Sequence, residues 1–362
     1  MKALFSLPRT LTPSPQNLPS PPKPTKSPSH LSFSLPTSSS SSSLSSSPQD
    51  PTPPKPLVVV GSANADIYVE VDRLPREGET VSARTGQTLA GGKGANQAAC
   101  GGRLSHPTYF VGQIGEDSHG RLVADALRGG GVRLDRLSAV AGAPTGHAVV
   151  MLQPDGENSI IIVGGANMCC WPDEVSEEDL EVVRGAGIVL LQREIPDAVN
   201  VQVAQAARSA GVPVILDAGG MEGPIPVELL QLVDILSPNE TELARLTGFQ
   251  TETFEQISQA AAKCHQMGVK QVLVKLGEKG SALFVDGEEP IKQPIIPTSK
   301  VLDTTGAGDT FTAAFAVAFV EGKPKKECLR FAAAAAALCV QVKGAIPSMP
   351  ERKAVLELLQ SQ

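Results

Sequence analysis

The sequence is poor in aromatic residues, which make up only 4% of its 362 residues. Hydrophobic residues still account for 41%, so Val, Leu, Ile and Ala must fill most of the core. Such a composition favours buried parallel strands covered by helices. The sequence also lacks an unbroken apolar run of the roughly 18 residues that a membrane-spanning helix needs. We therefore expect a globular α/β protein with no membrane partner.

Basic charge and cysteine motifs are scarce as well. The formal net charge of -7 argues against a protein that binds nucleic acid through general basic charge. None of the six cysteines forms a C-x-x-C pair, and most lie in apolar segments with a helical pattern. In a chain of this length we expect buried free thiols in a reducing compartment rather than a disulfide framework. The six residues are Cys100, Cys169, Cys170, Cys264, Cys328 and Cys339.

The segment Met1–Gln49 contains no Asp or Glu and is dominated by Ser and Pro. It cannot bury enough apolar surface to offset the entropy lost on ordering, so a plain disordered tail is one interpretation. A basic, Ser-rich, acid-free N-terminus is also typical of organelle transit peptides. Prolines interrupt every candidate signal-peptide apolar region, and Arg9 is the only Arg, which argues against a mitochondrial presequence. We expect a disordered transit peptide over residues 1–54 and a location in the chloroplast stroma.

Residues 55–362 read as one domain in which apolar strands alternate with helices. This alternation predicts a three-layer α/β fold, with a mostly parallel central sheet and helices on both faces. Ligands of such folds bind beyond the carboxyl ends of the strands. The expected strands are Leu57–Gly61, Ile188–Leu191, Val214–Asp217, Ile235–Ser237, Val272–Lys275 and Ala282–Val285, and the expected helices start at Lys93 or span Asp197–Ala210 and Thr253–Met267.

Two stretches interrupt this alternation. Residues 67–90 and 146–163 contain short segments of alternating pattern, such as HAVVML and SIIIV. Alternation with a period of two is typical of strands with one buried face. We expect antiparallel strands that form a small β-sheet lid outside the main sheet.

The motif Asp303–Thr310, of sequence DTTGAGDT, leads into the apolar run Phe311–Val320. Gly306 and Gly308 allow a tight turn that points successive N–H groups at one spot, at the positive end of the following helix. Asp309 would lie in the first turn of that helix, where a carboxylate can simply cap it. The alternative is that Asp309 is a general base for a hydroxyl group, beside amides that stabilise a transferring phosphoryl group.

A second glycine-rich motif, Gly91–Asn96, has the sequence GGKGAN and precedes a predicted helix. It matches neither G-x-G-x-x-G nor the Walker A pattern, and alone it is weak evidence. Upstream, Asn64 and Asp66 follow the first strand, where they can hydrogen-bond sugar hydroxyls or serve as ordinary turn residues. Lys93 by itself would be a solvated surface residue.

Two further segments follow predicted strands. Asn239 and Glu242 lie one turn apart at the start of a predicted helix, and their spacing alone favours a capping box. Gly277–Gly280 forms a tight turn that either lies along a nucleotide or merely joins two strands.

Taken together and in this order, these motifs resemble the ribokinase-type carbohydrate kinases, known as the PfkB family. The resemblance runs from Pro56 to nearly the C-terminus and includes GSANAD, GGKGANQA, PNETE and DTTGAGDTF. It implies the ribokinase-like three-layer fold and the transfer of a phosphoryl group from ATP. Within the family, GSANAD together with GGKGAN points to ribose, phosphorylated at its 5-hydroxyl. Fructose, adenosine or another nucleoside remain alternative substrates.

The resemblance also implies a role for individual residues. Asp309 would be the base and Gly306, Ala307 and Gly308 the anion hole. The sugar hydroxyls would be bound by Asn64, Asp66, Gly92, Lys93, Asn96 and Glu194. The nucleotide would lie along Asn239, Lys275, Gly277, Gly280 and Gly308, with Asn239 and Glu242 positioning Mg²⁺. A monovalent cation, usually K⁺, would lie near Asp303, Thr305, Cys339, Val342, Gly344 and Ser348.

One segment departs from the family pattern. Ala332–Ala337 is purely small and apolar, where relatives often offer a polar side chain near the adenine. The resemblance also implies a homodimer formed through the lid strands. Two other readings are a non-catalytic homologue within an organelle complex and a dinucleotide-binding oxidoreductase. The intact Gly306, Gly308 and Asp309 argue against the first, and the absence of G-x-G-x-x-G after the first strand argues against the second.

Overall fold

The computed structural model describes residues 53–154, 158–221 and 223–361. Residues 1–52 of the expected transit peptide lie outside these ranges. No helix among the described residues is long and apolar enough to cross a membrane.

The main sheet has nine strands in the order β13-β12-β11-β10-β9-β8-β1-β4-β5. The strands from β11 to β5 pair in parallel, whereas β12 and β13 are antiparallel additions at one edge. The sheet confirms the expected mostly parallel α/β fold. Its strands are β1 (Leu57–Val60), β4 (Thr108–Gly115), β5 (Arg133–Val140), β8 (Ile188–Arg193), β9 (Val214–Gly220), β10 (Ile235–Ser237), β11 (Gln271–Lys275), β12 (Ser281–Val285) and β13 (Ile291–Gln293).

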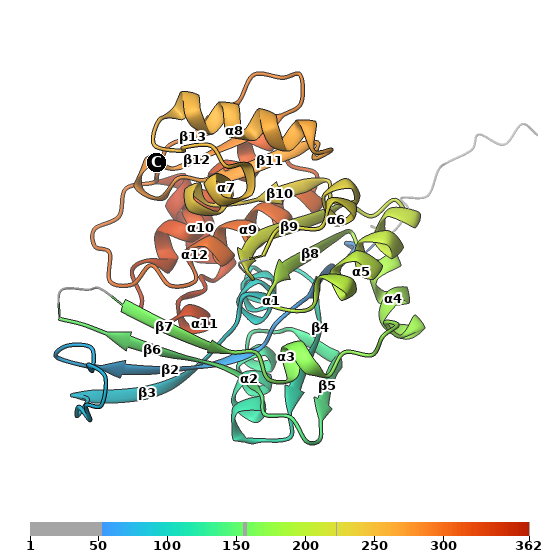
Figure 1. Ribbon diagram of the computed structural model, residues 1–362. Coiled ribbons are helices and arrows are strands. Elements are labelled where there is room, and N and C mark those ends of the chain that lie inside the picture. The colour runs from blue at the N-terminus through green and yellow to red at the C-terminus, as the bar shows by residue number, and fades with distance from the viewer. Residues whose placement is uncertain (1–52, 155–157, 222, 362) are drawn as a thin grey trace, which may run out of the picture. The chain divides into compact units, whose positions relative to one another are not determined.

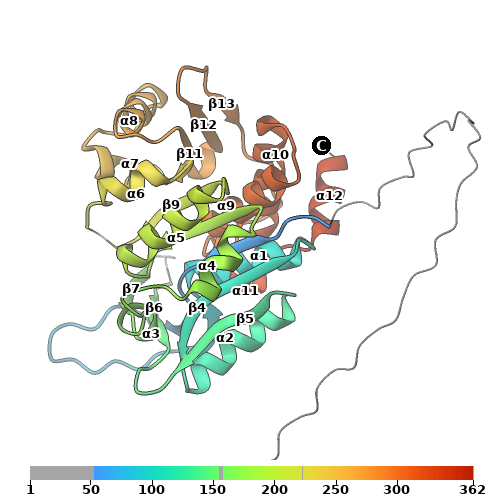
Figure 2. The ribbon, with the colours of Figure 1, turned by 90° about the vertical axis from the view of Figure 1, so that its right-hand side faces the viewer.

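Helices cover both faces of this sheet, which explains why the central strand β1 is apolar at every position. In β1, Leu57 and Val59 pack into one core and Val58 and Val60 into the other. Figure 2 shows helices on either side of the strands. One core contains side chains of α1 (Lys93–Arg103), α2 (Ser118–Gly129), α9 (Ala307–Val320), α10 (Lys325–Cys339) and α12 (Arg352–Gln360), and the other those of α4 (Glu177–Arg184), α5 (Asp197–Ser209), α6 (Val227–Leu232), α7 (Glu240–Thr247) and α8 (Phe254–Gln266).

A second sheet of four strands projects from the main domain and forms the expected lid (Figure 1). Its order is β3-β2-β6-β7, with bounds β2 (Asn64–Glu70), β3 (Thr85–Gly91), β6 (Gly146–Leu152) and β7 (Asn158–Val163). The outer pairs are antiparallel as expected, but the central strands β2 and β6 run parallel. The expectation of a wholly antiparallel lid was therefore wrong, because both central strands leave the main domain in the same direction.

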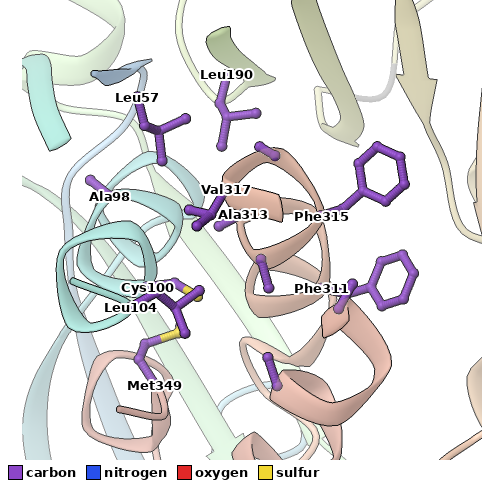
Figure 3. Close-up of a cluster of buried hydrophobic side chains, with 14 of the residues drawn as sticks. Leu57, Ala98, Cys100, Leu104, Leu190, Phe311, Ala313, Phe315, Val317 and Met349 are labelled. Carbon is purple, nitrogen blue, oxygen red and sulfur yellow. The ribbon is translucent and has the colours of Figure 1, made fainter. Parts of the chain in front are cut away.

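Helices α1 and α9 pack against each other in the centre of the first core (Figure 3). The residues from Asp309 to Ala318 in α9 are all buried, which is why this helix is apolar on every face. Small side chains such as Ala98 in α1 and Ala313 in α9 let the two helices approach closely. Their N-termini consequently lie near each other, and this positions the candidate site.

The structure moves several element bounds and changes one expectation about the cysteines. The predicted helix at Asp197–Ala210 is present and ends one residue earlier, at Ser209. The predicted helix at Thr253–Met267 is present and is one residue shorter at each end, spanning Phe254–Gln266. Four cysteines are buried free thiols as expected, whereas Cys169 is exposed and Cys170 half-buried. Both of these follow the lid, outside the apolar core helices. The remaining short helices are α3 (Ala166–Cys169), α11 (Ala345–Ser348) and the 3₁₀ turn η1 (Gly277–Lys279).

Candidate active site

The glycine-rich turn at Gly91–Lys93 joins the lid strand β3 directly to α1. Gly92 has φ of 90°, and a Cβ atom there would lie 2.7 Å from the backbone nitrogen of Asn64. A side chain would therefore be strained by conformation and excluded by contact. Glycine at this position lets the start of α1 lie directly against β2.

Asn64 and Asp66 lie in strand β2, so their interpretation as turn residues is wrong. They alternate along the strand and therefore point to the same face of the lid, and Asn64 pairs with Gly91 of β3. A Cβ atom on Gly91 would overlap the Asp66 carboxylate, so this glycine makes room for that side chain. The lid thus presents an amide and a carboxylate toward the start of α1.

Asp66 is almost wholly buried among other acids. Burial, followed by the nearby carboxylates of Glu194 and Asp309, raises the pKa of Asp66 to about 7. Glu194 follows β8, and its Oε2 accepts hydrogen bonds from the Ser62 hydroxyl at 2.6 Å and the Lys93 backbone N–H at 3.1 Å. The structure therefore brings Glu194 to the same cluster as Asp66 and Lys93, as expected from the resemblance.

Asp309 faces α1 and caps no helix. The N-cap of α9 is Gly306, at φ of 79°, and no side chain from the described part of the chain caps this helix end. Asp309 Oδ2 accepts from Asn96 Nδ2 at 2.9 Å, and Oδ1 accepts from Gln97 Nε2 and Lys93 Nζ, each at 3.4 Å. Three donors from one helix thus fix the orientation of a buried carboxylate. The capping interpretation of Asp309 is wrong for this reason.

The amides at the start of α9 are not equally free. The N–H of Ala307 donates to the Thr304 carbonyl at 3.1 Å, whereas within the described residues the N–H of Gly308 has no recorded acceptor. Asn96 Oδ1 is likewise buried without a hydrogen-bond partner in this part of the chain. A buried acceptor without a partner is costly unless a ligand supplies the donor. A polar ligand bound next to these two groups would supply the hydrogen-bond partners that they lack.

Asp217 belongs to this site but was missed by the sequence reasoning. It is fully buried in the middle of β9 and accepts from Lys275 Nζ at 2.6 Å, the Thr312 hydroxyl at 3.2 Å and the Gly219 N–H at 3.0 Å. Lys93 Nζ lies 3.5 Å from its other side. The sequence did contain a signal for Asp217, because this acid is the last residue of the apolar run Val214–Asp217. A polar residue at the end of a predicted strand can contact a ligand.

The two lysines and Asp217 form one charged network. Burial alone would raise the pKa of Asp217, but Lys275 and Lys93 hold that pKa below its usual range. Burial also opposes the charge of Lys93, yet the carboxylates of Asp217 and Asp309 raise its pKa well above the usual value. Lys93 is therefore a charged residue that lies between the carboxylates of Asp217 and Asp309. The interpretation of Lys93 as a solvated surface residue was wrong.

A mostly apolar pocket of about 470 Å³ lies next to Gly308. Lys275 lines this pocket, and a Cβ atom on Gly308 would lie 3.7 Å from Lys275 Cδ. Ala333, Ala336 and Ala337 form part of the wall, so the small residues of Ala332–Ala337 leave room rather than offer hydrogen bonds. Further lining residues are Gly277, Gly280, Ile295, Val301, Thr304 and Phe311.

Asn239 and Glu242 form the capping box that their spacing indicated. Asn239 Oδ1 accepts from the Glu242 N–H at 2.7 Å, and Glu242 Oε2 accepts from the Asn239 N–H at 2.8 Å. Glu242 Oε1 points toward the site. A Cβ atom on Gly219 would lie 2.8 Å from this oxygen and 2.5 Å from Lys93 Cε, so both side chains approach the same glycine. A free carboxylate oxygen beside the lysine network is a hard donor that fits Mg²⁺.

The residues expected around a monovalent cation come from two loops that Asp303 ties together. Asp303 Oδ1 accepts from the Thr305 N–H and Oδ2 from the Gly344 N–H, both at 2.8 Å. Cys339 Sγ lies 3.0 Å from Ser348 Oγ in the same region, whereas the side chain of Val342 is exposed. No group of three or more His, Cys, Asp and Glu side chains with metal-binding geometry occurs among the described residues. A cation here would depend on backbone carbonyl oxygens.

Comparisons of the sequence and of the structure with known proteins both find carbohydrate kinases. The family described as pfkB family carbohydrate kinase matches residues 55–352. The ribokinase of Arabidopsis thaliana is 75% identical over 306 residues, covering 84% of this chain and 81% of its own. The ribokinase of Bacillus subtilis is 37% identical and is covered over 99% of its length, against 84% of this chain. The solved structure of Arabidopsis thaliana ribokinase complexed with ribose and ATP superposes with a TM-score of 0.83 at 74% identity, covering 85% of this chain and 99% of that one.

Proposed function

The chain belongs to the pfkB family of carbohydrate kinases, and we propose that it transfers the γ-phosphoryl group of ATP to the 5-hydroxyl of D-ribose. The products are ribose 5-phosphate and ADP. The observation that carries the proposal is the position of Asp309, held by three donors of α1 at the start of α9 and beside the 470 Å³ pocket. Similarity to the ribokinases supports ribose as the substrate.

In the proposed mechanism Asp309 accepts the proton of the 5-hydroxyl as its oxygen attacks the γ-phosphorus. Asn96, Gln97 and Lys93 hold the carboxylate in one orientation, so little reorganisation is needed during the reaction. The Gly308 N–H and the positive end of α9 stabilise the negative charge of the transferring group. Gly306 and Ala307 shape this turn, with Ala307 fixed through Thr304.

The sugar would be bound between the lid and the start of α1. Asn64 and Asp66 face this space from β2, and Glu194 and Asn96 face it from the main domain. These side chains offer acceptors for hydroxyl protons, and the buried Oδ1 of Asn96 gains the partner that it lacks. Gly92 permits the close approach of the two segments. Lys93 contributes through its contacts with Asp309 and Asp217 rather than as a free cation.

ATP would place its adenine in the apolar pocket and its phosphates toward Lys275 and Gly308. Shape and apolar contact with the alanine wall would hold the base, since Ala333, Ala336 and Ala337 offer no hydrogen bonds. When bound with ATP, Mg²⁺ would neutralise phosphate charge, and Glu242 and Asn239 are the residues that would position it.

Ribose recognition through Asp66 predicts a pH-dependent affinity. With a pKa of about 7, the Asp66 carboxyl is mostly neutral below pH 7 and then loses part of its capacity to accept two hydroxyl hydrogen bonds. We expect the KM for ribose to rise as the pH falls below 7, by at most about tenfold per pH unit. Steady-state kinetics between pH 5.5 and 8.5 measure this. Asp66→Asn, which cannot titrate, should raise the KM and flatten its profile; an unchanged slope in this variant would assign the titration elsewhere.

We also propose that K⁺ activates the enzyme through the loops around Asp303. Because Asp303 bridges Thr305 and Gly344, a cation bound to their carbonyls would order the start of the motif that leads into α9. We expect turnover to be severalfold higher in K⁺ than in a K⁺-free buffer of equal ionic strength. Asp303→Ala should reduce this response. Equal rates in both buffers for the unaltered protein would contradict the proposal.

A homodimer through the lid is a further part of the proposal. Strand β7 is an edge strand, and Ile160, Ile161 and Ile162 are each more than half exposed on it. An exposed apolar edge strand favours pairing with another strand. Sedimentation velocity would measure the oligomeric state, and a monomer at micromolar concentration would contradict this part.

We propose the chloroplast stroma as the location, on the composition of Met1–Gln49 alone. Imaging of that segment fused to a fluorescent protein would test it. A cytosolic signal would contradict the proposal.

The decisive experiment for the function is turnover of ATP by residues 55–362, with Mg²⁺ and K⁺, across ribose, fructose, adenosine and other nucleosides. A clear preference for ribose is expected. Preference for another sugar or nucleoside would keep the chemistry and change the substrate. Absence of turnover with every candidate would favour a non-catalytic homologue instead.

A further inference from the structure

The lid is fastened to the main domain by the short helix α3. The Asn167 carboxamide accepts from the Ala63 N–H at 2.9 Å and donates to the Ala63 carbonyl at 3.1 Å and to Asn64 Oδ1 at 2.7 Å. The Ala166 N–H donates to the Pro144 carbonyl at 2.8 Å. Helix α3, which follows β7, therefore binds the segments just before β2 and β6.

Two adjacent cysteines lie at the C-terminal end of α3. Cys169 is the last residue of α3 and is exposed, Cys170 follows it half-buried, and their Sγ atoms lie 3.2 Å apart. The Trp171 Nε1–H donates to the Asn167 carbonyl at 2.9 Å, so a hydrogen bond spans the cysteine pair. Any change of backbone conformation at the pair would act on Asn167 through this bond and through the helix itself.

The other four cysteines are protected from thiol reagents. Each is buried, and burial raises the pKa of Cys264 to about 12 and that of Cys328 to about 11. Cys100 and Cys339 lie in the core beneath the active site, and burial raises their pKa values too. Because these four thiols are buried, Cys169 and Cys170 are the thiols that a reagent can reach in the folded protein. The hydrogen bond with Cys169 raises the pKa of Cys170, so the more exposed Cys169 is the thiol that attacks first.

We propose that Cys169 and Cys170 form a modification site for disulfide reagents, and that closing a disulfide between them weakens sugar binding through Asn167. The Cys169 thiolate attacks one sulfur of glutathione disulfide and releases one glutathione thiolate. The Cys170 thiolate then attacks the Cys169 sulfur of the mixed disulfide and releases the second. The two cysteines are oxidised, two glutathione molecules are reduced, and the two thiol protons end on glutathione.

Such a bond is expected to be easily reversed. Adjacent Cα atoms are only about 3.8 Å apart, whereas the two Cα atoms of most disulfides are about 4.4–6.8 Å apart. A ring between neighbouring residues is therefore strained, and strained exposed disulfides are the labile ones. A dithiol reductant should reopen it, which makes the site suited to regulation rather than to stabilisation.

The effect should fall on sugar binding more than on turnover. Closing the ring brings the sulfurs from 3.2 Å to about 2.05 Å and so must rotate the end of α3. Asn167 holds Asn64, which faces the proposed sugar space, but it makes no recorded hydrogen bond to Asp309. This part of the inference rests on the proposed function. We expect the KM for ribose to rise about fivefold or more while kcat changes by less than about twofold.

The test uses the full chain treated with glutathione disulfide and then with dithiothreitol. Thiol titration of the native protein should find two reactive thiols before oxidation and none after it, with a mass loss of two hydrogens. The KM for ribose should rise and return on reduction. Absence of turnover before oxidation would count against the proposed function alone, because thiol counts and mass would still report on the site.

Matched variants separate the ring from other effects of oxidation. Cys169→Ser and Cys170→Ser each remove the ring, and the KM of the double variant should not respond to oxidant. Asn167→Ala should raise the KM without oxidant, as the oxidised protein does. The inference is overturned if glutathione disulfide forms no ring, if the ring leaves the KM unchanged, or if the double variant responds like the unaltered protein.

Discussion

Asp309→Asn is expected to lower kcat by about 10²–10⁴-fold while leaving the fold and ribose affinity nearly unchanged. The amide has the same shape as the carboxylate but cannot accept the proton of the 5-hydroxyl. It keeps one oxygen for the Asn96 Nδ2–H, whose distance to Asp309 is 2.9 Å. The loss should therefore appear in the transition state and not in substrate binding. Steady-state kinetics, with ribose binding measured by calorimetry, test both parts.

Gln97→Met is the matched control for Asp309→Asn. Gln97 also contacts Asp309, at 3.4 Å, but takes no part in the proton transfer. This variant should cost far less in kcat. Near-normal turnover of Asp309→Asn would eliminate Asp309 as the base, and a large loss of thermal stability would show that the variant reports on folding instead.

Asp217→Ala should be the most destabilising substitution in the site and should also reduce turnover strongly. Removal of this fully buried carboxylate leaves Lys275 without its 2.6 Å partner and leaves Asp309 as the ion-pair partner of Lys93 among the described residues. Breaking a buried ion pair costs about 3–5 kcal/mol in the free energy of unfolding. Lys93 would then move toward Asp309 and lower its capacity to accept a proton. Denaturant unfolding and the pH profile of kcat measure the two effects.

Thr312→Val is the control for this network. Thr312 donates to the same carboxylate at 3.2 Å but carries no charge, so its loss should cost about 1 kcal/mol and leave the pH profile of kcat in place. If Asp217→Ala proves no more destabilising than Thr312→Val, the charged network contributes little. If turnover survives in Asp217→Ala, the two lysines do not need this acid for their positions.

Several features followed from the sequence because they depend on local chemistry. The apolar runs beginning at Leu57 and Val214 predicted strands buried on both faces, and the structure confirms them in the central sheet. Gly306 was expected to lie in a tight turn that precedes a helix, and it is the N-cap of α9 with a positive φ, which glycine adopts without strain. The spacing of Asn239 and Glu242 likewise specified their capping box. Each of these depends on residues within one turn or one strand.

The tertiary structure decided which distant residues meet. Asp217 is separated by 58 residues from Lys275 and by 124 from Lys93, and no local pattern pairs them. Asn64 and Asp66 resembled turn residues until their pairing with β3 and β6 placed them on the inner face of a lid strand. Asp309 could have been a helix cap on sequence alone. Because α1 packs against α9, its carboxylate instead accepts hydrogen bonds from three side chains of α1. Sequence patterns determine local conformation, but ion pairs and hydrogen bonds between segments depend on packing and register, which only the folded chain fixes.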